Sequence, residues 1–201
     1  GPGTASFANV NSATTSVTVS IVGAYTFRWT VANAPCVAST DDVTITFTAG
    51  PTTAAAGDDQ TICTTAGSAT MAGNTPSVGT GTWSQVSGPT ATITTPTSPT
   101  TTITGMTTAG AYVFKWTIAS APCAASEDQV SVTVNAPPTA ANAGSDASLC
   151  GLTTNLAGNA PAIGSGTWTL FNGPGTASSV YANCATTRVS VAMGGTNTFW
   201  G

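Results

Sequence analysis

Two kinds of side chain in this sequence could do chemistry: seven carboxylates and five cysteines. Six of the carboxylates form three adjacent pairs, Asp41 with Asp42, Asp58 with Asp59 and Glu127 with Asp128, and the last four are the candidates for a calcium site. Carboxylates bind calcium when six to eight oxygen ligands converge. The simpler interpretation is that they are solvated loop acids, which keep a strand edge from pairing with another chain. A glycosidase also uses two carboxylates, but it needs a cleft between them, and a loop-rich pole of a small domain makes a poor one.

The five cysteines are Cys36, Cys63, Cys123, Cys150 and Cys184. No two of them have the Cys-x-x-Cys spacing of a thiolate metal site, and histidine is absent from the sequence. Disulfide formation is therefore the chemistry that we expect of them. Disulfides persist in oxidising compartments, so this expectation places the protein outside the cell or on its surface.

The composition excludes several classes of function. Without histidine there can be no Ser-His-Asp or Cys-His catalytic site. Three well-separated Lys/Arg residues cannot make a basic patch for nucleic acid, and no stretch approaches the roughly 18 apolar residues of a membrane span. Only 5% of the residues are charged, against about 25% in a typical soluble protein. We therefore expect a protein that is not an enzyme and has no cofactor, unless the acids hold calcium.

An internal repeat organises the elements that must position these residues. Residues 23–63 match residues 110–150 without a gap at 23 of 41 positions, and the segment GNTPSVGTGTW from Gly73 recurs as GNAPAIGSGTW from Gly158. The period of about 85–87 residues is too long for a solenoid repeat and suits a β-sandwich module.

The phase of the repeat predicts three segments. Residues 1–50 are the C-terminal part of one sandwich, residues 51–137 are a complete sandwich, and residues 138–201 are the N-terminal part of a third. The Pro/Ala/Thr-rich stretches Ala49–Ala56 and Ala136–Ala143 are the expected linkers. Because both ends of the chain fall inside a repeat, we expect a piece of a longer tandem array.

Seven short strands are predicted in the complete repeat, with turn residues about every ten positions and no helical periodicity. Threonine and valine, which suit a pleated surface, are abundant in them. The strongest strand, Ala111–Ala119, alternates aromatic and aliphatic residues on one face. This pattern predicts an all-β fold of immunoglobulin-like antiparallel sandwiches. The predicted strands are Gln60–Cys63, Ser68–Ala72, Thr82–Val86, Ala91–Thr94, Thr100–Thr104, Ala111–Ala119 and Gln129–Val134.

Two tryptophan positions recur in the repeat: Trp83 matches Trp168, and Trp116 matches Trp29. The simpler interpretation is that the two positions supply one core aromatic to each of the two facing sheets. The alternative is an exposed aromatic platform that stacks on sugars. Arg28 and Lys115 occupy equivalent sites between inward-facing residues, so we expect them to point outward.

The cysteine pairing follows from the expected topology. In an immunoglobulin-like sandwich the start of the first strand and the loop between the last two strands lie at the same pole. We therefore predict a Cys63–Cys123 disulfide and, at the same pole, the four acids of the possible calcium site. Cys36 and Cys150 would pair with residues outside this chain, and Cys184 could instead pair with Cys150.

The combined motifs resemble a known family. GDDQTIC at Gly57–Cys63, MAGNTP at Met71–Pro76, GTGTWSQVSGP at Gly79–Pro89 and AYVFKWTI at Ala111–Ile118 are similar to the PKD-like, immunoglobulin-like tandem repeats of Bacteroidota surface adhesins. The gliding-motility adhesins exported by the type IX secretion system are members of that group. The resemblance implies a secreted, surface-displayed filament that acts as a structural or adhesive stalk.

Two other functions stay open from the sequence. One is a carbohydrate-binding accessory module of a secreted enzyme, which requires exposed aromatic side chains on one sheet face. The other is a subunit of a self-associating extracellular fibre. The expected partners are accordingly the neighbouring repeats of the same chain, surface polysaccharide or other copies of the protein, and neither nucleic acid nor membrane.

Overall fold

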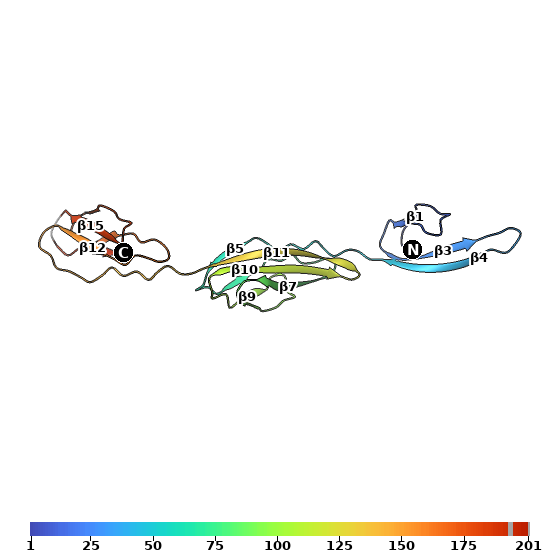
Figure 1. The fold of residues 1–201 in the computed structure, drawn as a ribbon, viewed down its shortest axis with the longest axis horizontal. Helices are drawn as coiled ribbons and strands as arrows, with labels where there is room; N and C mark the ends of the chain where they lie inside the picture. The colour runs from blue at the N-terminus through green and yellow to red at the C-terminus, as the bar shows by residue number, and fades with distance from the viewer. Residues whose placement is uncertain (193–194, 201) are drawn as a thin grey trace. The chain divides into compact units, whose positions relative to one another are not determined.

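The computed structural model describes residues 1–192 and 195–200, so residues 193, 194 and 201 of the third predicted segment lie outside the described residues. Every regular element in the described part of the chain is a β-strand, which confirms the predicted all-β, immunoglobulin-like fold (Figure 1). No helix that could span a membrane occurs among these residues. The chain divides into two compact units: one of residues 1–62, 67–106 and 110–133, and one of residues 63–66, 107–109 and 134–201.

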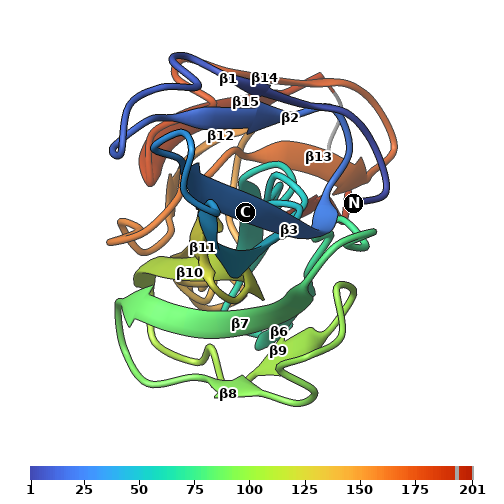
Figure 2. The same cartoon turned by 90° about the vertical axis from the view of Figure 1, so that its right-hand side faces the viewer.

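The complete sandwich consists of two sheets that pack face to face (Figures 1 and 2). All seven predicted strands are present, although several differ by a few residues at their ends. The four-stranded sheet has the order β5-β11-β10-β7, and the three-stranded sheet has the order β6-β9-β8. The strands are β5 (Gln60–Cys63), β6 (Ser68–Thr70), β7 (Thr80–Ser87), β8 (Thr92–Ile93), β9 (Thr102–Thr104), β10 (Gly110–Ser120) and β11 (Cys123–Asn135).

The core of this sandwich comes from the alternating faces of β10 and β11. Every second residue of a strand points to the same face, so each strand contributes one set of apolar side chains. The four inward residues of β10 are fully buried, and those of β11 are at most 2% exposed. The face predicted from the alternation is therefore the one that is buried in the core of the sandwich. These residues are Tyr112, Phe114, Trp116 and Ile118 of β10 and Val130, Val132 and Val134 of β11.

The chain enters the complete sandwich alongside β11 and runs in the same direction. Ala54 N–H donates to the Ser126 hydroxyl at 2.9 Å, and ten residues later Thr64 N–H donates to the Asn135 carbonyl at 2.9 Å. Because the residue numbers rise together on both sides, the entering chain and β11 are parallel. The linker is therefore shorter than predicted, since residues 52–56 already belong to the sandwich.

The first segment contains two antiparallel hairpins, β1 (Ala5–Phe7) with β2 (Val17–Val19) and β3 (Gly23–Val31) with β4 (Ser39–Phe47). The first hairpin lies over one end of the second (Figure 1). At that end Tyr25 is 3% exposed, and the ring of Phe7 meets the ring of Phe27 edge-on at 5.6 Å between centroids. The rest of the β3–β4 hairpin has no such cover.

The third segment repeats the front part of the sandwich. A sheet of order β12-β15-β14 and a pair β13-β16 form it. The turn at Gly158 repeats the turn at Gly73, and its hydrogen bonds are equivalent. Gly158 N–H donates to Ala185 O at 2.8 Å, as Gly73 N–H donates to Pro99 O at 3.0 Å. The strands are β12 (Thr153–Ala157), β13 (Thr169–Asn172), β14 (Ala177–Ser179), β15 (Thr186–Val191) and β16 (Thr198–Trp200).

Candidate functional site

The four acids of the possible calcium site serve separate interactions. Glu127 accepts a hydrogen bond from the Lys115 ammonium at 2.9 Å, across neighbouring strands of the sheet. That hydrogen bond holds the pKa of the Glu127 carboxyl below its usual value. Arg28 and Asp42 form the corresponding outward pair on the β3–β4 hairpin, at 2.8 Å, as the outward placement of both cations predicts.

Two of the other acids satisfy backbone donors where the entering chain runs along β11. Asp128 Oδ2 accepts from Ala56 N–H at 2.7 Å, and Asp59 Oδ1 accepts from Ser131 N–H at 2.8 Å. Ala56 is 1% exposed, and a buried N–H without a partner would be costly. These carboxylates thus tie the entering chain to the last strand.

This arrangement corrects the calcium hypothesis. Glu127 and Asp128 are successive strand residues, so their side chains leave opposite faces of β11. Asp58 is exposed, and Asp59 bonds three residues further along the strand than Asp128. Among the described residues no group of three or more His, Cys, Asp or Glu side chains could hold a metal ion. Nor are Asp59, Glu127 and Asp128 solvated loop acids that keep an edge from pairing, because each bonds a group on a neighbouring segment.

The predicted Cys63–Cys123 disulfide is also corrected. Both thiols are free, as are the other three cysteines. Cys63 ends β5 beside the Asn135 end of β11, whereas Cys123 begins β11 twelve residues earlier. At about 3.3 Å per residue the two lie about 40 Å apart, and a disulfide requires Cα atoms within about 7 Å.

The error in the prediction came from the position of Cys63 along the first strand, because the chain already runs beside β11 from Ala54. The start of the entering chain does share a pole with the β10–β11 turn, but Cys63 stands at the other end of it. There the hydroxyl and backbone of Thr65 hydrogen-bond the Cys63 thiol and lower its pKa.

Trp83 and Trp116 form a cross-strand pair within one sheet, which corrects the expectation that they belong to facing sheets. They are direct partners in the β7–β10 ladder, with ring centroids 5.1 Å apart. Trp83 is 2% exposed and Trp116 is fully buried, and their indole N–H groups donate to backbone carbonyls of Pro99 and Asn74. A sugar-stacking platform therefore cannot use this pair.

The two remaining tryptophans differ from each other. Trp168 is 8% exposed and donates to Ala185 O, as Trp83 does to Pro99 O. Trp29 is 44% exposed, although its counterpart Trp116 is fully buried, so the expectation that it is a core aromatic is wrong. The exposure arises because the described part of the first segment has no strands that cover this end of the β3–β4 hairpin.

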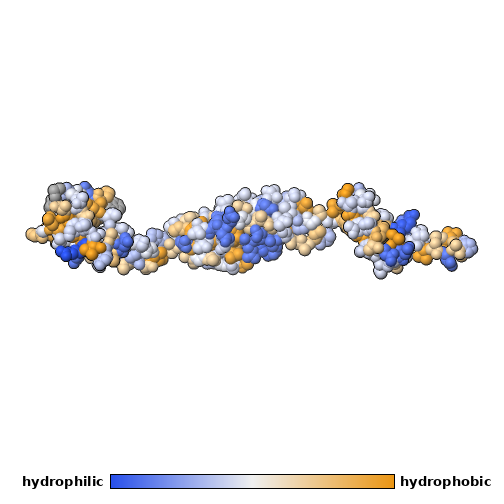
Figure 3. Space-filling view, turned by 90° about the horizontal axis from the view of Figure 1, so that it is seen from above, coloured by the Kyte–Doolittle hydropathy of each residue, from blue (hydrophilic) through white to orange (hydrophobic). Residues whose placement is uncertain are grey.

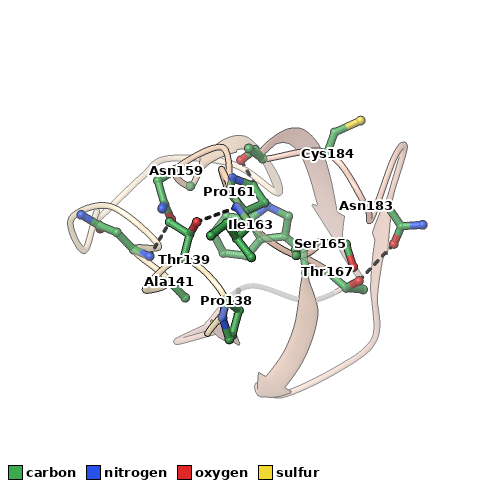
Figure 4. A pocket seen from close by; sticks show the side chains of 16 residues that line it. Pro138, Thr139, Ala141, Asn159, Pro161, Ile163, Ser165, Thr167, Asn183 and Cys184 are labelled. Carbon is green, nitrogen blue, oxygen red and sulfur yellow. Dashed lines mark hydrogen bonds between the residues drawn. The ribbon is translucent and has the colours of Figure 1, made fainter. Parts of the chain in front are cut away.

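The third segment contains an open cavity of about 490 Å³ beside Trp168 (Figure 4). Its wall is formed by small and uncharged side chains, including Thr139, Asn159, Pro161, Ile163 and Thr167. Among the described residues that line the cavity there is no acid and no cation, and Cys184 is the one ionisable side chain.

A hydrogen-bond cluster that the sequence reasoning missed fixes the entry of each sandwich. The Thr52 hydroxyl accepts from Ser77 N–H and Val78 N–H at 2.9 Å, and Asn74 bonds the backbone of Thr53 and Ala55. The third segment repeats the whole cluster with Thr139 in place of Thr52 and Asn159 in place of Asn74. The signal was available, because the Pro-Thr and Gly-Asn dipeptides recur with the repeat.

Comparisons with known proteins agree with this class of domain. Residues 56–134, the complete sandwich, match the model of the K319L-like PKD domain family. The complete sandwich is therefore similar to a PKD domain with an immunoglobulin-like fold. Among solved structures, the solution structure of the PKD domain from KIAA 1837 protein is 25% identical with a TM-score of 0.38, covering 46% of this chain and 92% of that chain. No curated protein matches the chain.

Proposed function

We propose that this chain is a structural segment of an extracellular, cell-surface repeat protein, in which non-catalytic PKD-like sandwiches act as a stalk. The observation that carries the proposal is the tandem repeat of one PKD-like module whose polar groups are engaged in holding the module together. PKD domains are generally extracellular and non-catalytic, which supports both parts of the proposal.

The chemistry of the described residues supports a mechanical role. The acids tie the entering chain to β11 or pair with cations, and the recurring Thr and Asn side chains fix where each sandwich begins. These hydrogen bonds fix the chain at the start of the complete sandwich and at the start of the third segment. Few residues of the linkers before them are therefore without a hydrogen bond to a sandwich. A short, ordered connection suits a stalk better than a flexible tether.

The resemblance to Bacteroidota adhesin repeats makes the proposal more specific. On this proposal the protein is secreted by the type IX system and displayed as an adhesive filament. The buried Trp83–Trp116 pair weighs against the alternative of a carbohydrate-binding accessory module.

Surface display can be tested with an antibody raised against residues 51–137. We expect it to label intact cells, and we expect protease added to intact cells to remove the signal. An antibody against a cytoplasmic protein serves as the control for cell integrity. Labelling that requires permeabilised cells would overturn the extracellular assignment, and electron microscopy showing the label flush with the envelope would overturn the stalk.

A further inference from the structure

Two cysteines recur with the repeat, and they lie at opposite ends of the complete sandwich. Cys63 is the last residue of β5, and Cys123 is the first residue of β11. The first and third segments contain these positions again, since Cys36 matches Cys123 and Cys150 matches Cys63 with an offset of 87. The length of β11 separates the two cysteines of one sandwich, which excludes a disulfide between them. Two such positions meet only across a junction between sandwiches.

Cys63 lies beside the residue at which the chain leaves the sandwich. Cys63 and Asn135 are the last residues of β5 and β11, which are neighbours in the sheet. The N–H of Thr64, the residue after Cys63, donates to the Asn135 carbonyl at 2.9 Å. Because neighbouring strands lie about 4.7–4.9 Å apart, Cys63 and Asn135 are adjacent in the structure.

Cys123 lies beside the equivalent residue of the preceding segment. Thr48 matches Asn135 in the repeat, with the same offset of 87. The Cys123 thiol hydrogen-bonds the carbonyl oxygens of Thr48 at 3.8 Å and of Ala49 at 3.6 Å. One position of the repeat is thus contacted from two sides. Its own sandwich brings Cys63 to it, and the next sandwich brings Cys123 to it.

The surface of the complete sandwich has little with which to hold a neighbouring repeat non-covalently. Among its large hydrophobic side chains only Val86 is exposed, at 49%, and the structure describes every residue of this sandwich. In Figure 3 its hydrophilic and hydrophobic residues are interspersed on the side in view, without a broad apolar face. The central part of a stable non-covalent interface is apolar. A covalent bond at the junction would therefore add what this surface lacks.

We propose that, where two complete repeats follow each other, a disulfide joins the Cys63 position of the first to the Cys123 position of the second. Both thiols then lie at the backbone of one residue, the equivalent of Thr48 and Asn135. Each repeat gives one cysteine to the junction before it and one to the junction after it, so each junction has one bond. The inference rests on the tandem organisation in the proposed function, and on an oxidising compartment in which such bonds persist.

The reaction is thiol–disulfide exchange with a small disulfide such as oxidised glutathione. The Cys63 thiolate attacks one glutathione sulfur and releases one reduced glutathione. The thiolate of Cys123 in the next repeat then attacks the Cys63 sulfur, which forms the protein disulfide and releases the second glutathione. Two protein thiols lose two protons and two electrons, and one oxidised glutathione becomes two reduced molecules. The hydrogen bonds of Thr65 lower the pKa of the Cys63 thiol, which favours Cys63 as the attacking group.

A chain with two complete sandwiches tests the proposal. A second copy of residues 51–137 is inserted directly after residue 137, and the joint then reads Asn-Ala-Pro-Pro-Thr, as residues 135–139 do in the unaltered chain. Three variants keep two cysteines each and have serine at the other cysteine positions. The test variant keeps Cys63 in the first sandwich and Cys123 in the second. One control keeps Cys123 in the first and Cys63 in the second, and the other keeps both in the first.

Mass spectrometry after equilibration with oxidised and reduced glutathione counts the thiols of the monomer that react with a maleimide, and it distinguishes a protein disulfide from bound glutathione. We expect the test variant to lose both labels and each control to keep both, because the cysteines of the controls lie at distant poles. The inserted chain with all its natural cysteines should also lose two labels. Urea unfolding in reductant checks that the variants fold alike.

A test variant that keeps both labels would overturn the proposal, as would a control that forms the disulfide equally well. The inserted chain with its natural cysteines keeps this conclusion independent of the serine substitutions. The oxidation is measured on purified protein, whereas the antibody experiment measures display on cells. The disulfide can therefore fail while the stalk stands, and the reverse outcome is equally distinguishable.

Discussion

Replacing Trp116 and Trp29 by alanine compares the same residue of the repeat in two surroundings. Trp116 is fully buried, stacks on Trp83 and donates its indole N–H to Asn74 O. Truncating a buried tryptophan costs about 3–5 kcal/mol of the free energy of unfolding. Trp29 is 44% exposed, so slightly more than half of its surface is covered and its loss should cost about 2 kcal/mol.

Native-state hydrogen exchange read by mass spectrometry measures both effects in the whole chain. For Trp116→Ala, amides of β11 that exchange through unfolding of the sandwich should exchange about a thousandfold faster, which corresponds to about 4 kcal/mol. For Trp29→Ala, in dilute solution, β11 should be unchanged and β4 should exchange faster by roughly 30-fold.

The comparison can fail in two ways. If Trp116→Ala accelerates exchange in β11 by less than about tenfold, burial and the Trp83 stack do not contribute as calculated. If Trp29→Ala destabilises β4 as much as Trp116→Ala destabilises β11, the exposed end of the hairpin is covered after all. Either result would refute the assignment of core and open surface.

Three further predictions concern the Lys115–Glu127 ion pair, the Asp128 carboxylate and the cysteines. Lys115→Met should raise the pKa of Glu127 toward its ordinary value in an NMR titration. The stabilisation from this pair should be complete above the ordinary glutamate pKa and lost as the pH falls through the lowered one; no change in the Glu127 titration would argue against the ion pair. Asp128→Ala should leave Ala56 N–H without its acceptor and lower the free energy of unfolding by about 1–3 kcal/mol, measured by urea unfolding. If Asp128→Asn lowers the free energy of unfolding by as much as Asp128→Ala does, the role of the carboxylate is contradicted. Alkylation of the unreduced protein should label all five cysteines, and a cross-linked peptide joining the thiol at the end of β5 to that at the start of β11 would contradict the parallel pairing.

Much of the fold could be predicted from the sequence because its signals are local. The alternation in residues 110–120 and 129–134 identifies strands and their buried faces, and it depends only on the two-residue period of a strand. The repeat adds the boundaries of the sandwich, since a turn that occurs twice in the sequence occurs twice in the structure. The burial of Tyr112, Phe114 and Val132 follows from these two observations.

The candidate site was less accessible to the same reasoning. The calcium hypothesis required two acidic pairs to converge, and convergence depends on which side of β11 each carboxylate leaves and on what it meets there. Asp128 meets Ala56 N–H and Glu127 meets Lys115, and neither partner is adjacent in the sequence.

The sequence by itself determined the module, its strands and the face that each strand buries, because hydrophobic alternation and repetition are written along the chain. Only the tertiary structure showed that the entering chain already runs beside β11 from Ala54, and hence that Cys63 and Cys123 lie at opposite poles. It also placed Trp83 beside Trp116 in one sheet and left Trp29 exposed. Strand order, strand direction and the burial of a face depend on contacts between segments that are distant in the sequence. Trp29 and Trp116 occupy equivalent positions of the repeat, but they have different neighbours in space.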